Sequence, residues 1–517
     1  GRSGYEHFND GNNLYVLAQF YPRMAVYNDV EGWQNMQYWG SGEFALTFGN
    51  YEVNITVPAD HIMEATGELQ NRAEVYTSEQ VKRYEQAQNS FDKPVVIVTQ
   101  AEAMAAEKGF STQKKTWKFK AENVRDFGIS TSRKFILDMM AVKIGTKKVM
   151  AVSLYPKEGN PLWETYSTKA VAHTLKSYSS YTFDYPYPKA VSVNARDQGM
   201  EYPMICWNYG RPKEDGTYTD QVKYGMLGVI IHEVGHNFFP MIVNSDERQW
   251  SWMDEGLNTF MQFLAQSTFD PNFPLQRGPA KNIVPYMKGD QSKIEPIMTN
   301  SETINQFGNN AYGKPATGLN ILRETIMGHE LFDYAFRTYA NRWKFKHPTP
   351  EDFFRTMEDA SAVDLDWFIR GWFYTTDYTD IGIKEVQQYF VSNDPPKDFK
   401  APEVTRRNRL QASGPQVYMV ASASADFKTE MNKPFDIKEI AALDEFVKTK
   451  FTTEEQAKLD NPKYFYQVTF DKPGGLVMPI IVELTFEDGT TETHKFPAQI
   501  WRMNDTAVSR TFAVDKN

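Results

Sequence analysis

The sequence predicts an α+β protein of several domains, with strands at both ends and a mixed, helix-rich region between them. Three observations predict this class. The chain has 517 residues, whereas a single domain has about 150. Strand-like alternation fills the first 70 or so residues and returns after Asp380, while helical periodicity dominates the middle. We therefore expect an N-terminal β-rich domain at 1–122, an α+β domain at 123–382 and a C-terminal β-sandwich-like domain at 383–517.

The N-terminal region begins with apolar runs that favour strands. The predicted strands are 14–20 and 42–58, and the second half of the latter alternates between apolar and polar residues. A polar, helix-like stretch follows at 71–90, then a strand at 93–100 and a short helix at 101–108. Because strands outnumber helices here, the region is predicted to be mainly β.

The central region changes from strands to helices. We predict strands at 115–122, 135–142 and 147–156, a helix at 163–181 and a buried sheet edge at 187–207. The longest apolar helix is expected at 222–239, and a second helix at 253–266. The remaining predicted helices are 318–328, 332–343, 350–360 and 364–373.

The C-terminal region returns to strand patterns at the spacing of a β-sandwich. The predicted strands are 381–391, 464–470, 478–486, 492–501 and 509–515. A charged, proline-containing stretch at 392–463 interrupts them, with one predicted helix at 437–451.

Composition excludes several classes of protein. The formal charge of −10 and a pI near 5.5 argue against a nucleic-acid partner. Cys206 is the only cysteine, so no internal disulfide and no cysteine-rich zinc module can form. No apolar run approaches about 18 residues, so we expect no transmembrane segment, and the first residues do not resemble a signal peptide.

The main chemical signal is a His-Glu-x-x-His motif on the longest predicted helix. His232 and His236 are four residues apart, so both imidazoles point the same way and can share one metal ion. Glu233 lies beside that face and can reach a metal-bound water. Glu255 opens the next helix and can supply a third ligand. Two histidines and a glutamate around zinc leave one coordination position for water, as in catalytic sites.

Chance is a weak explanation of this motif. With 8 histidines in 517 residues, His-Glu-x-x-His would arise in roughly one such chain in a hundred, before the later glutamate is required. The alternative is a pair of structural histidines on an apolar helix. That interpretation does not require a glutamate next to them, and a buried glutamate without a partner is costly.

These residues resemble the zinc signature of the gluzincin metallopeptidases of the aminopeptidase N type. HEVGH followed by WMDEGLNTF matches that signature. A second motif, QGMEYP at 198–203, resembles the family's Gly-Ala-Met-Glu-Asn segment, although Gln198 and Tyr202 depart from it. The resemblance implies that Glu201 binds the free α-amine of the substrate, with Gly199 and Met200 in the same substrate-binding segment.

Two further motifs extend the resemblance. NNAYGKPATGLNIL is similar to the family's Tyr-x-Lys-Gly segment, which implies that Tyr312 donates to the tetrahedral oxyanion. AQFYPRMAVYND resembles a glutamine-containing strand of the family, which assigns Gln19 to substrate binding. Tyr21 stands where relatives often carry a second amine-binding Glu or Gln. The family's fold implies a thermolysin-like catalytic domain holding the motif helix, and the opening β region is shorter than the family's, which suggests truncation.

The resemblance implies a zinc-dependent aminopeptidase with one zinc per chain. Glu233 would act as general base toward the zinc-activated water, and the partners would be peptides or proteins. Two alternatives remain: a zinc endopeptidase of the same fold, if Glu201 does not face the metal, and a peptide-binding scaffold without turnover. A peptide-trimming role favours export to a periplasm or cell surface. Oligomeric state and side-chain preference are not predicted.

For two acidic segments near the motif, a structural role is weighed against a role at the metal. Asp246, Glu247 and Arg248 are expected to form a solvated loop, since no histidine accompanies them. Asp254 could orient a zinc-bound histidine or cap the second helix.

Overall fold

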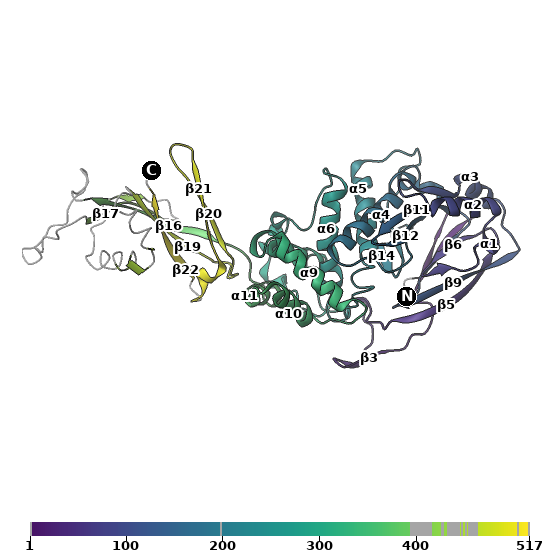
Figure 1. The fold of residues 1–517 in the computed structure, drawn as a ribbon, viewed down its shortest axis with the longest axis horizontal. Coiled ribbons are helices and arrows are strands. Elements are labelled where there is room, and N and C mark those ends of the chain that lie inside the picture. The colour runs from purple at the N-terminus through teal and green to yellow at the C-terminus, as the bar shows by residue number, and fades with distance from the viewer. Residues whose placement is uncertain are drawn as a thin grey trace, which may run out of the picture. The chain divides into compact units, whose positions relative to one another are not determined.

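A computed structural model describes residues 3–196, 199–392, 416–424, 429–431, 464–503 and 506–514, with positions 445, 448, 449 and 452. Its contacts divide the chain into two units, Gly1–Thr376 and Asp377–Asn517 (Figure 1). The three domain ranges expected from the sequence stay predictions.

The N-terminal part of the first unit is built mainly of two antiparallel sheets. One has the strand order β1-β2-β10-β6 and the other β5-β9-β7. Strand β5 alternates between partly buried and exposed residues, as its sequence predicted. The strands are β1 (Gly4–His7), β2 (Asn13–Leu17), β5 (Gly49–Pro58), β6 (Ile62–Ala65), β7 (Glu68–Leu69), β9 (Lys114–Val124) and β10 (Ile129–Ser132).

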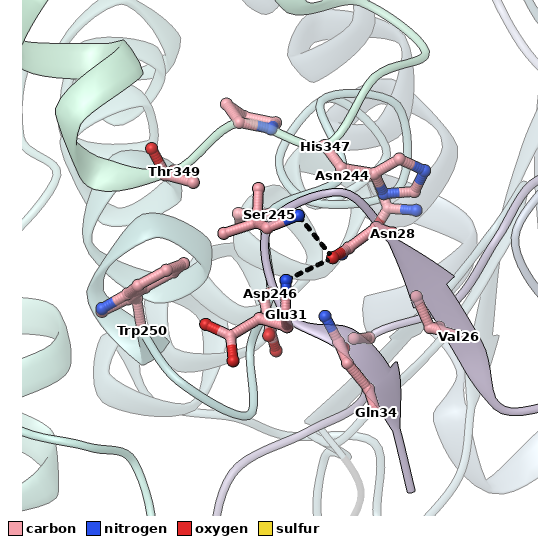
Figure 2. Close-up of a pocket in the computed structure, with 13 residues that line it drawn as sticks. Val26, Asn28, Glu31, Gln34, Asn244, Ser245, Asp246, Trp250, His347 and Thr349 are labelled. Atoms are coloured by element: carbon pink, nitrogen blue, oxygen red, sulfur yellow. Dashed lines mark hydrogen bonds between the residues drawn. The ribbon is translucent and has the colours of Figure 1, made fainter.

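A small hairpin joins β3 (Val26–Asn28) to β4 (Gly32–Gln34). The Asn28 side chain closes its turn by accepting hydrogen bonds from the backbone N–H groups of Val30 (3.1 Å) and Glu31 (2.8 Å) (Figure 2). A cavity of about 20 Å³ lies between this hairpin and residues 244–250. That volume accommodates about one water molecule, so we assign this cavity to packing.

The predicted helix at 71–90 is two helices, and the short helix after it is also present. They are α1 (Arg72–Val75), α2 (Ser78–Ala87) and α3 (Gln100–Ala106). Helices α2 and α3 begin with capping boxes, in which Thr77 pairs with Gln80 and Thr99 with Glu102. These reciprocal bonds satisfy backbone N–H groups that the first helical turn leaves unpaired.

A six-stranded mixed sheet forms the centre of the first unit, in the order β14-β15-β13-β12-β11-β8. Helix α4 (Leu162–Tyr181) packs on β11 and β12. The predicted sheet edge at 187–207 is three strands, of which only β14 is at the edge. The strands are β8 (Val95–Val98), β11 (Ile136–Ile144), β12 (Lys147–Tyr155), β13 (Lys189–Asn194), β14 (Gly199–Tyr202) and β15 (Ile205–Asn208).

The remainder of the first unit is helical. Helix α5 (Asp220–Gly235) contacts β14, β15 and α4. It ends at Gly235 instead of the predicted Phe239, because Pro240 has no N–H and restricts the residue before it. The later helices are α6 (Leu257–Phe269), α7 (Val284–Met287), α8 (Lys314–Ile321), α9 (His329–Trp343), α10 (Pro350–Ser361) and α11 (Asp366–Tyr374).

Three wider, π-helical turns interrupt this region, and the sequence did not predict them. They are Trp252–Gly256, Gly308–Gly313 and Leu322–Ile326. Such turns occur often at functional sites, since they turn additional side chains toward one point.

The second unit contains a five-stranded antiparallel sheet, in the order β18-β17-β16-β19-β22, and a separate hairpin β20-β21. Phe470, Trp501 and Phe512 belong to the core in which the hairpin packs against the sheet. The predicted helix at 437–451 lies largely outside the described residues. The strands are β16 (Gly382–Ser392), β17 (Gln416–Ser424), β18 (Thr429–Met431), β19 (Tyr464–Asp471), β20 (Ile480–Thr485), β21 (Thr491–Phe496) and β22 (Ala507–Val514).

Within the described part of the chain, none of the helices combines the length and the apolar character that crossing a bilayer requires.

Candidate metal centre

The last turn of α5 brings two imidazoles together. The Nε2 atoms of His232 and His236 lie 3.0 Å apart, and their rings are nearly perpendicular. The spacing of four residues explains this proximity, because residues i and i+4 share one face of a helix.

The π-helical turn Trp252–Gly256 brings a carboxylate to the same point. Glu255 Oε2 lies 3.0 Å from His232 Nε2 and 3.2 Å from His236 Nε2. All three residues are buried, and one ligand atom from each lies within 4.8 Å of the others. Two imidazole nitrogens and one carboxylate oxygen around one point form the ligand set of catalytic zinc sites.

The outer nitrogens of both histidines also have partners. His232 Nδ1 lies 3.0 Å from Gln262 Oε1. His236 Nδ1 lies 2.9 Å from both the Phe239 carbonyl and Asp254 Oδ1. Asp254 Oδ1 is thus within ion-pair distance of His236, while the Phe239 carbonyl is the hydrogen-bond partner of Nδ1. Such partners fix which ring nitrogen faces a metal, and the role of Asp254 in orienting His236 stays a prediction. Sequence reasoning missed Gln262, although it follows Glu255 by seven residues, two turns along the helix.

Close packing beneath the motif depends on a glycine. A Cβ atom on Gly235 would lie 2.2 Å from Tyr178 Oη and 2.4 Å from Asn258 Oδ1. Asn258 in turn donates a hydrogen bond of 2.8 Å to the carbonyl of His232. Gly235 thus allows α4 and α6 to support the helix that carries both histidines.

Glu233 faces the edge strand β14. A Cβ atom on Gly199 would lie 3.2 Å from Glu233 Oε1, so the first residue of β14 lies directly against this carboxylate. Glu201 is on the same strand and is 4% exposed. One of its oxygens belongs to a second compact group with His236 and Asp254. The sequence motifs around 201 and 232 therefore meet at one place.

Three carboxylate oxygens at this place are buried without a hydrogen-bond partner among the described residues: Glu201 Oε1, Glu233 Oε2 and Asp254 Oδ1. Burial, followed by the charge of Glu201, raises the pKa of Glu233 well above its usual range. Burial alone would lower the pKa of His236, but Glu201, Asp254 and Glu255 raise it overall. The two histidines lower the pKa of Glu255, against the effect of burial.

These electrostatics fit a cation. Four buried acidic groups, Glu201, Glu233, Asp254 and Glu255, surround two histidines, and a divalent cation would compensate their charge. Metal binding displaces protons from such ligands, so the proton that the acidic surroundings favour on His236 would be released.

Tyr312 lies in the second π-helical turn and reaches the same centre. Its hydroxyl group donates a hydrogen bond of 2.6 Å to Glu255 Oε1, and its ring stacks on His232 at 5.7 Å between centroids. The Arg277 guanidinium lies 4.5 Å from the centre of the ring. Burial and the neighbouring Glu255 raise the pKa of Tyr312 well above its usual value, so the phenol stays protonated and can donate.

Gln19 and Met200, the other side chains predicted to bind substrate, lie in different surroundings. Gln19 lies close enough to Tyr202, the neighbour of Glu201 on β14, to act against the burial that raises the pKa of this tyrosine, and Gln19 Nε2 has no hydrogen-bond partner among the described residues. The Met200 side chain packs in the hydrophobic core of the first unit. The prediction for Met200 is therefore corrected: strand alternation turns its side chain away from Glu201, and only its main chain can face the site.

The prediction of a solvated loop at Asp246–Arg248 is wrong for Glu247. This side chain is buried and pairs with Arg125, at 2.5 Å between Oε1 and Nη1. The arginine that balances its charge is far away in the sequence, so no local pattern indicated the burial of Glu247.

The part of the chain that contains the candidate metal centre is similar to known peptidases. A model of the peptidase family M1 domain matches residues 166–372. The chain is 23% identical over 250 residues to alanine/arginine aminopeptidase of Saccharomyces cerevisiae, which covers 45% of this chain and 29% of that protein. It is 24% identical over 245 residues to human glutamyl aminopeptidase, which covers 44% of this chain and 25% of that protein.

Among solved structures, the complex of Legionella pneumophila aminopeptidase A with aspartic acid is similar at a TM-score of 0.54 and 10% identity. The match covers 99% of this chain and 46% of that one, and supports the multidomain α+β fold. An M1 zinc metallopeptidase from Deinococcus radiodurans matches at a TM-score of 0.47 and 17% identity, over 65% of this chain and 66% of that one.

Proposed function

We propose that this chain, whose residues 166–372 match a model of the peptidase family M1 domain, is a zinc aminopeptidase that removes N-terminal residues from peptides. The observation that carries this proposal is the His232–His236–Glu255 group, with ligand atoms within 4.8 Å of one another, beside the buried carboxylates of Glu233 and Glu201. The matched stretch spans less than a third of the relatives' length. The proposed activity is therefore supported mainly by the geometry of this site.

Each residue has a distinct role in the proposed reaction. His232, His236 and Glu255 hold one zinc ion per chain, and Asp254 and Gln262 orient the two histidines. Glu233 accepts a proton from the attacking water and passes it to the leaving amine. Glu201 pairs with the substrate's α-ammonium and so sets the first peptide bond at the reacting position. When bound, zinc polarises the scissile carbonyl and lowers the pKa of water.

A matched peptide pair tests this function. We expect the zinc-loaded protein to cleave a peptide with a free N-terminus and to leave its N-acetylated form intact, as followed by mass spectrometry. The acetyl group removes the positive charge that Glu201 would bind. Cleavage of the acetylated peptide would instead assign an endopeptidase. Inactivity toward a broad peptide panel, with zinc bound, would favour a peptide-binding protein.

Replacement of Tyr312 by phenylalanine should lower kcat by about a hundredfold, with little change in KM. Loss of one donor to a developing oxyanion typically has such an effect on the rate, and phenylalanine keeps the ring stacked on His232. Steady-state kinetics on a peptide with a free N-terminus would check this, with zinc content measured in parallel. An unchanged kcat would remove Tyr312 from the mechanism and leave it a partner of Glu255 only.

Export to a periplasm or cell surface fits a peptide-trimming enzyme and remains part of the proposal. Cell fractionation of the native host with an antibody to the protein would test it.

A further inference from the structure

An arginine from a separate segment lies over the ring of Tyr312. The guanidinium carbon of Arg277 is 4.5 Å from the centre of this ring. A Cβ atom on Gly308, the first residue of the π-helical turn that carries Tyr312, would lie 3.8 Å from Arg277 Nη2. The guanidinium group therefore lies against both the ring and the beginning of this turn. A cation in such a position is attracted by the electron-rich face of the aromatic ring.

Two asparagines fix the backbone on either side of Arg277. On its N-terminal side, the side chain of Asn282 donates a hydrogen bond of 2.9 Å to the carbonyl of Leu275. On its C-terminal side, Asn320 Nδ2 donates to the carbonyl of Gly278 at 3.1 Å. The position from which the Arg277 side chain extends is therefore determined by contacts on both sides.

The C-terminal anchor joins this segment to the helix that follows Tyr312. Asn320 lies in α8, which continues directly from the turn that carries Tyr312. Gly278 has a φ of +105°, and a Cβ atom there would lie 2.6 Å from the ring of Phe263 in α6. Glycine thus permits both the backbone conformation and the close packing that this anchor requires. The segment of Arg277 and the turn of Tyr312 are held together through one helix.

The charge of Arg277 is available to the ring. Arg277 is exposed and forms neither an ion pair nor a hydrogen bond with any residue in the described part of the chain. By contrast, Arg125 is paired with Glu247. A carboxylate next to a guanidinium group would offset its charge and weaken its effect on a neighbouring ring. Among the described residues, Arg277 has no such acid partner.

This charge acts on the hydroxyl group of Tyr312 in the direction that the proposed reaction requires. A cation over the face of a phenol withdraws electron density from the ring and its oxygen, so the O–H group becomes a stronger hydrogen-bond donor. In the proposed reaction, the Tyr312 hydroxyl group donates to an oxygen whose negative charge develops only in the transition state. The effect of Arg277 is therefore larger in the transition state than in the bound substrate, and it should change kcat more than KM.

We propose that Arg277 is a positioning residue that holds the ring of Tyr312 and strengthens its hydrogen bond to the developing oxyanion. This inference rests on the proposed aminopeptidase function and adds a residue to it. Arg277 acts through Tyr312 in this role and does not contact the substrate. A direct contact between Arg277 and an acidic group of the substrate is the competing explanation, and the experiments below distinguish the two.

Replacement of Arg277 tests the role of its charge. Arg277→Met keeps a long side chain without the charge, whereas Arg277→Lys keeps a cation that can lie over the ring. With the zinc-loaded full chain and a peptide with a free N-terminus, Arg277→Met should lower kcat roughly fivefold to thirtyfold and leave KM within about twofold. Arg277→Lys should keep kcat within about twofold of the unchanged protein. Arg355→Met, at an exposed position of α10, should change neither value.

Combination with Tyr312→Phe distinguishes action through the phenol from contact with substrate. In the Tyr312→Phe protein, the further change Arg277→Met should lower kcat by less than about twofold, because no hydroxyl group remains to be strengthened. A loss as large as that in the unchanged protein would overturn the proposal. A loss that appears in KM, and only for peptides with an acidic first residue, would also overturn it and assign Arg277 to substrate binding.

A spectroscopic measurement gives a readout that does not depend on activity. In carbon-13 NMR of the zinc-loaded full chain labelled at tyrosine Cζ, the resonance that is missing from Tyr312→Phe identifies Tyr312. This resonance should shift in Arg277→Met and stay in place in Arg355→Met. An unchanged resonance in Arg277→Met would show that the guanidinium group does not act on the phenol, and would overturn the proposal.

The outcomes separate this proposal from the function on which it rests. Thermal unfolding verifies that each variant is folded. If the unchanged zinc-loaded protein cleaves no peptide, the proposed function fails, and the role of Arg277 fails with it. If the unchanged protein is active and Arg277→Met retains its full kcat, only the role of Arg277 is overturned.

Discussion

Replacing Glu233 by glutamine should lower kcat on the order of a thousandfold while zinc content stays at its original level. Glutamine keeps the size of the side chain but cannot accept a proton, and general-base catalysis typically contributes about 10² to 10⁴ in rate. Glu233 is placed for this role because it follows His232 directly and its Oε1 faces Gly199 on β14. Its Oε2 has no hydrogen-bond partner among the described residues, so a water molecule can occupy that side.

The measurement compares kcat on a peptide with a free N-terminus and zinc content by mass spectrometry in the same samples. Glu330→Gln, which removes an exposed carboxylate from the first turn of α9, serves as a matched control and should retain full activity. A Glu233→Gln protein with zinc bound and more than a tenth of the original kcat would show that another group removes the proton. Loss of zinc from this variant would instead show that Glu233 helps to hold the metal.

The central part of the site could be predicted because local geometry determines it. The interval between His232 and His236 fixes their shared helix face whatever surrounds the helix. Glu255 could be assigned from its place at the start of the next helix. Its exact position could not, because it depends on the π-helical turn at 252–256, and that turn packs closely on a distant segment: a Cβ on Gly256 would lie 2.6 Å from Pro315. The sequence of the turn alone does not predict the contact between Gly256 and Pro315.

Contacts between residues that are far apart in the sequence could not be predicted from local patterns. Arg125 contacts Asn244 from 119 residues away, and Phe44 contacts Glu247 from 203 residues away. Both contacts depend on how the N-terminal sheets pack on the helical region. Glu247 was therefore interpreted as solvated.

The fold was predicted best where one period extends over a whole element. Helix α4 was expected at 163–181 and is observed at Leu162–Tyr181, and strand β5 alternates as its sequence indicates. Ends and interruptions were less predictable. Helix α8 gives way to a π-helical turn at Leu322, inside a segment predicted to be one helix. Pairing partners such as β2 with β10 could not be predicted, because nothing in either strand specifies the other.

A second large effect is expected outside the metal centre, at Asp138 in β11. This carboxyl group is buried, with Tyr155 donating to Oδ2 at 2.6 Å and Thr168 donating to Oδ1. Burial raises its pKa from 3.8 to about 7, although both hydrogen bonds act in the opposite direction. Between about pH 4 and pH 7 the folded state therefore binds a proton that the unfolded state has released.

The sign of the pH dependence follows from that difference. Below about pH 4 the group is protonated in both states, and above about pH 7 it is ionised in both, with the buried charge destabilising the fold. The free energy of unfolding should thus fall as the pH rises through this interval. At about 1.4 kcal/mol per pKa unit, the whole change attributable to Asp138 is on the order of 4 kcal/mol.

Asp138→Asn removes the ionisation and keeps the size of the side chain. In urea unfolding at several pH values from 4 to 8, the variant should gain stability relative to the original protein as the pH rises, by up to about 4 kcal/mol. Asp359→Asn, at an exposed position of α10, should show no such trend. A constant difference between Asp138→Asn and the original protein across this range would mean that Asp138 does not change its protonation there. The hydroxyl groups of Tyr155 and Thr168 would then be sufficient to keep it ionised inside the sheet.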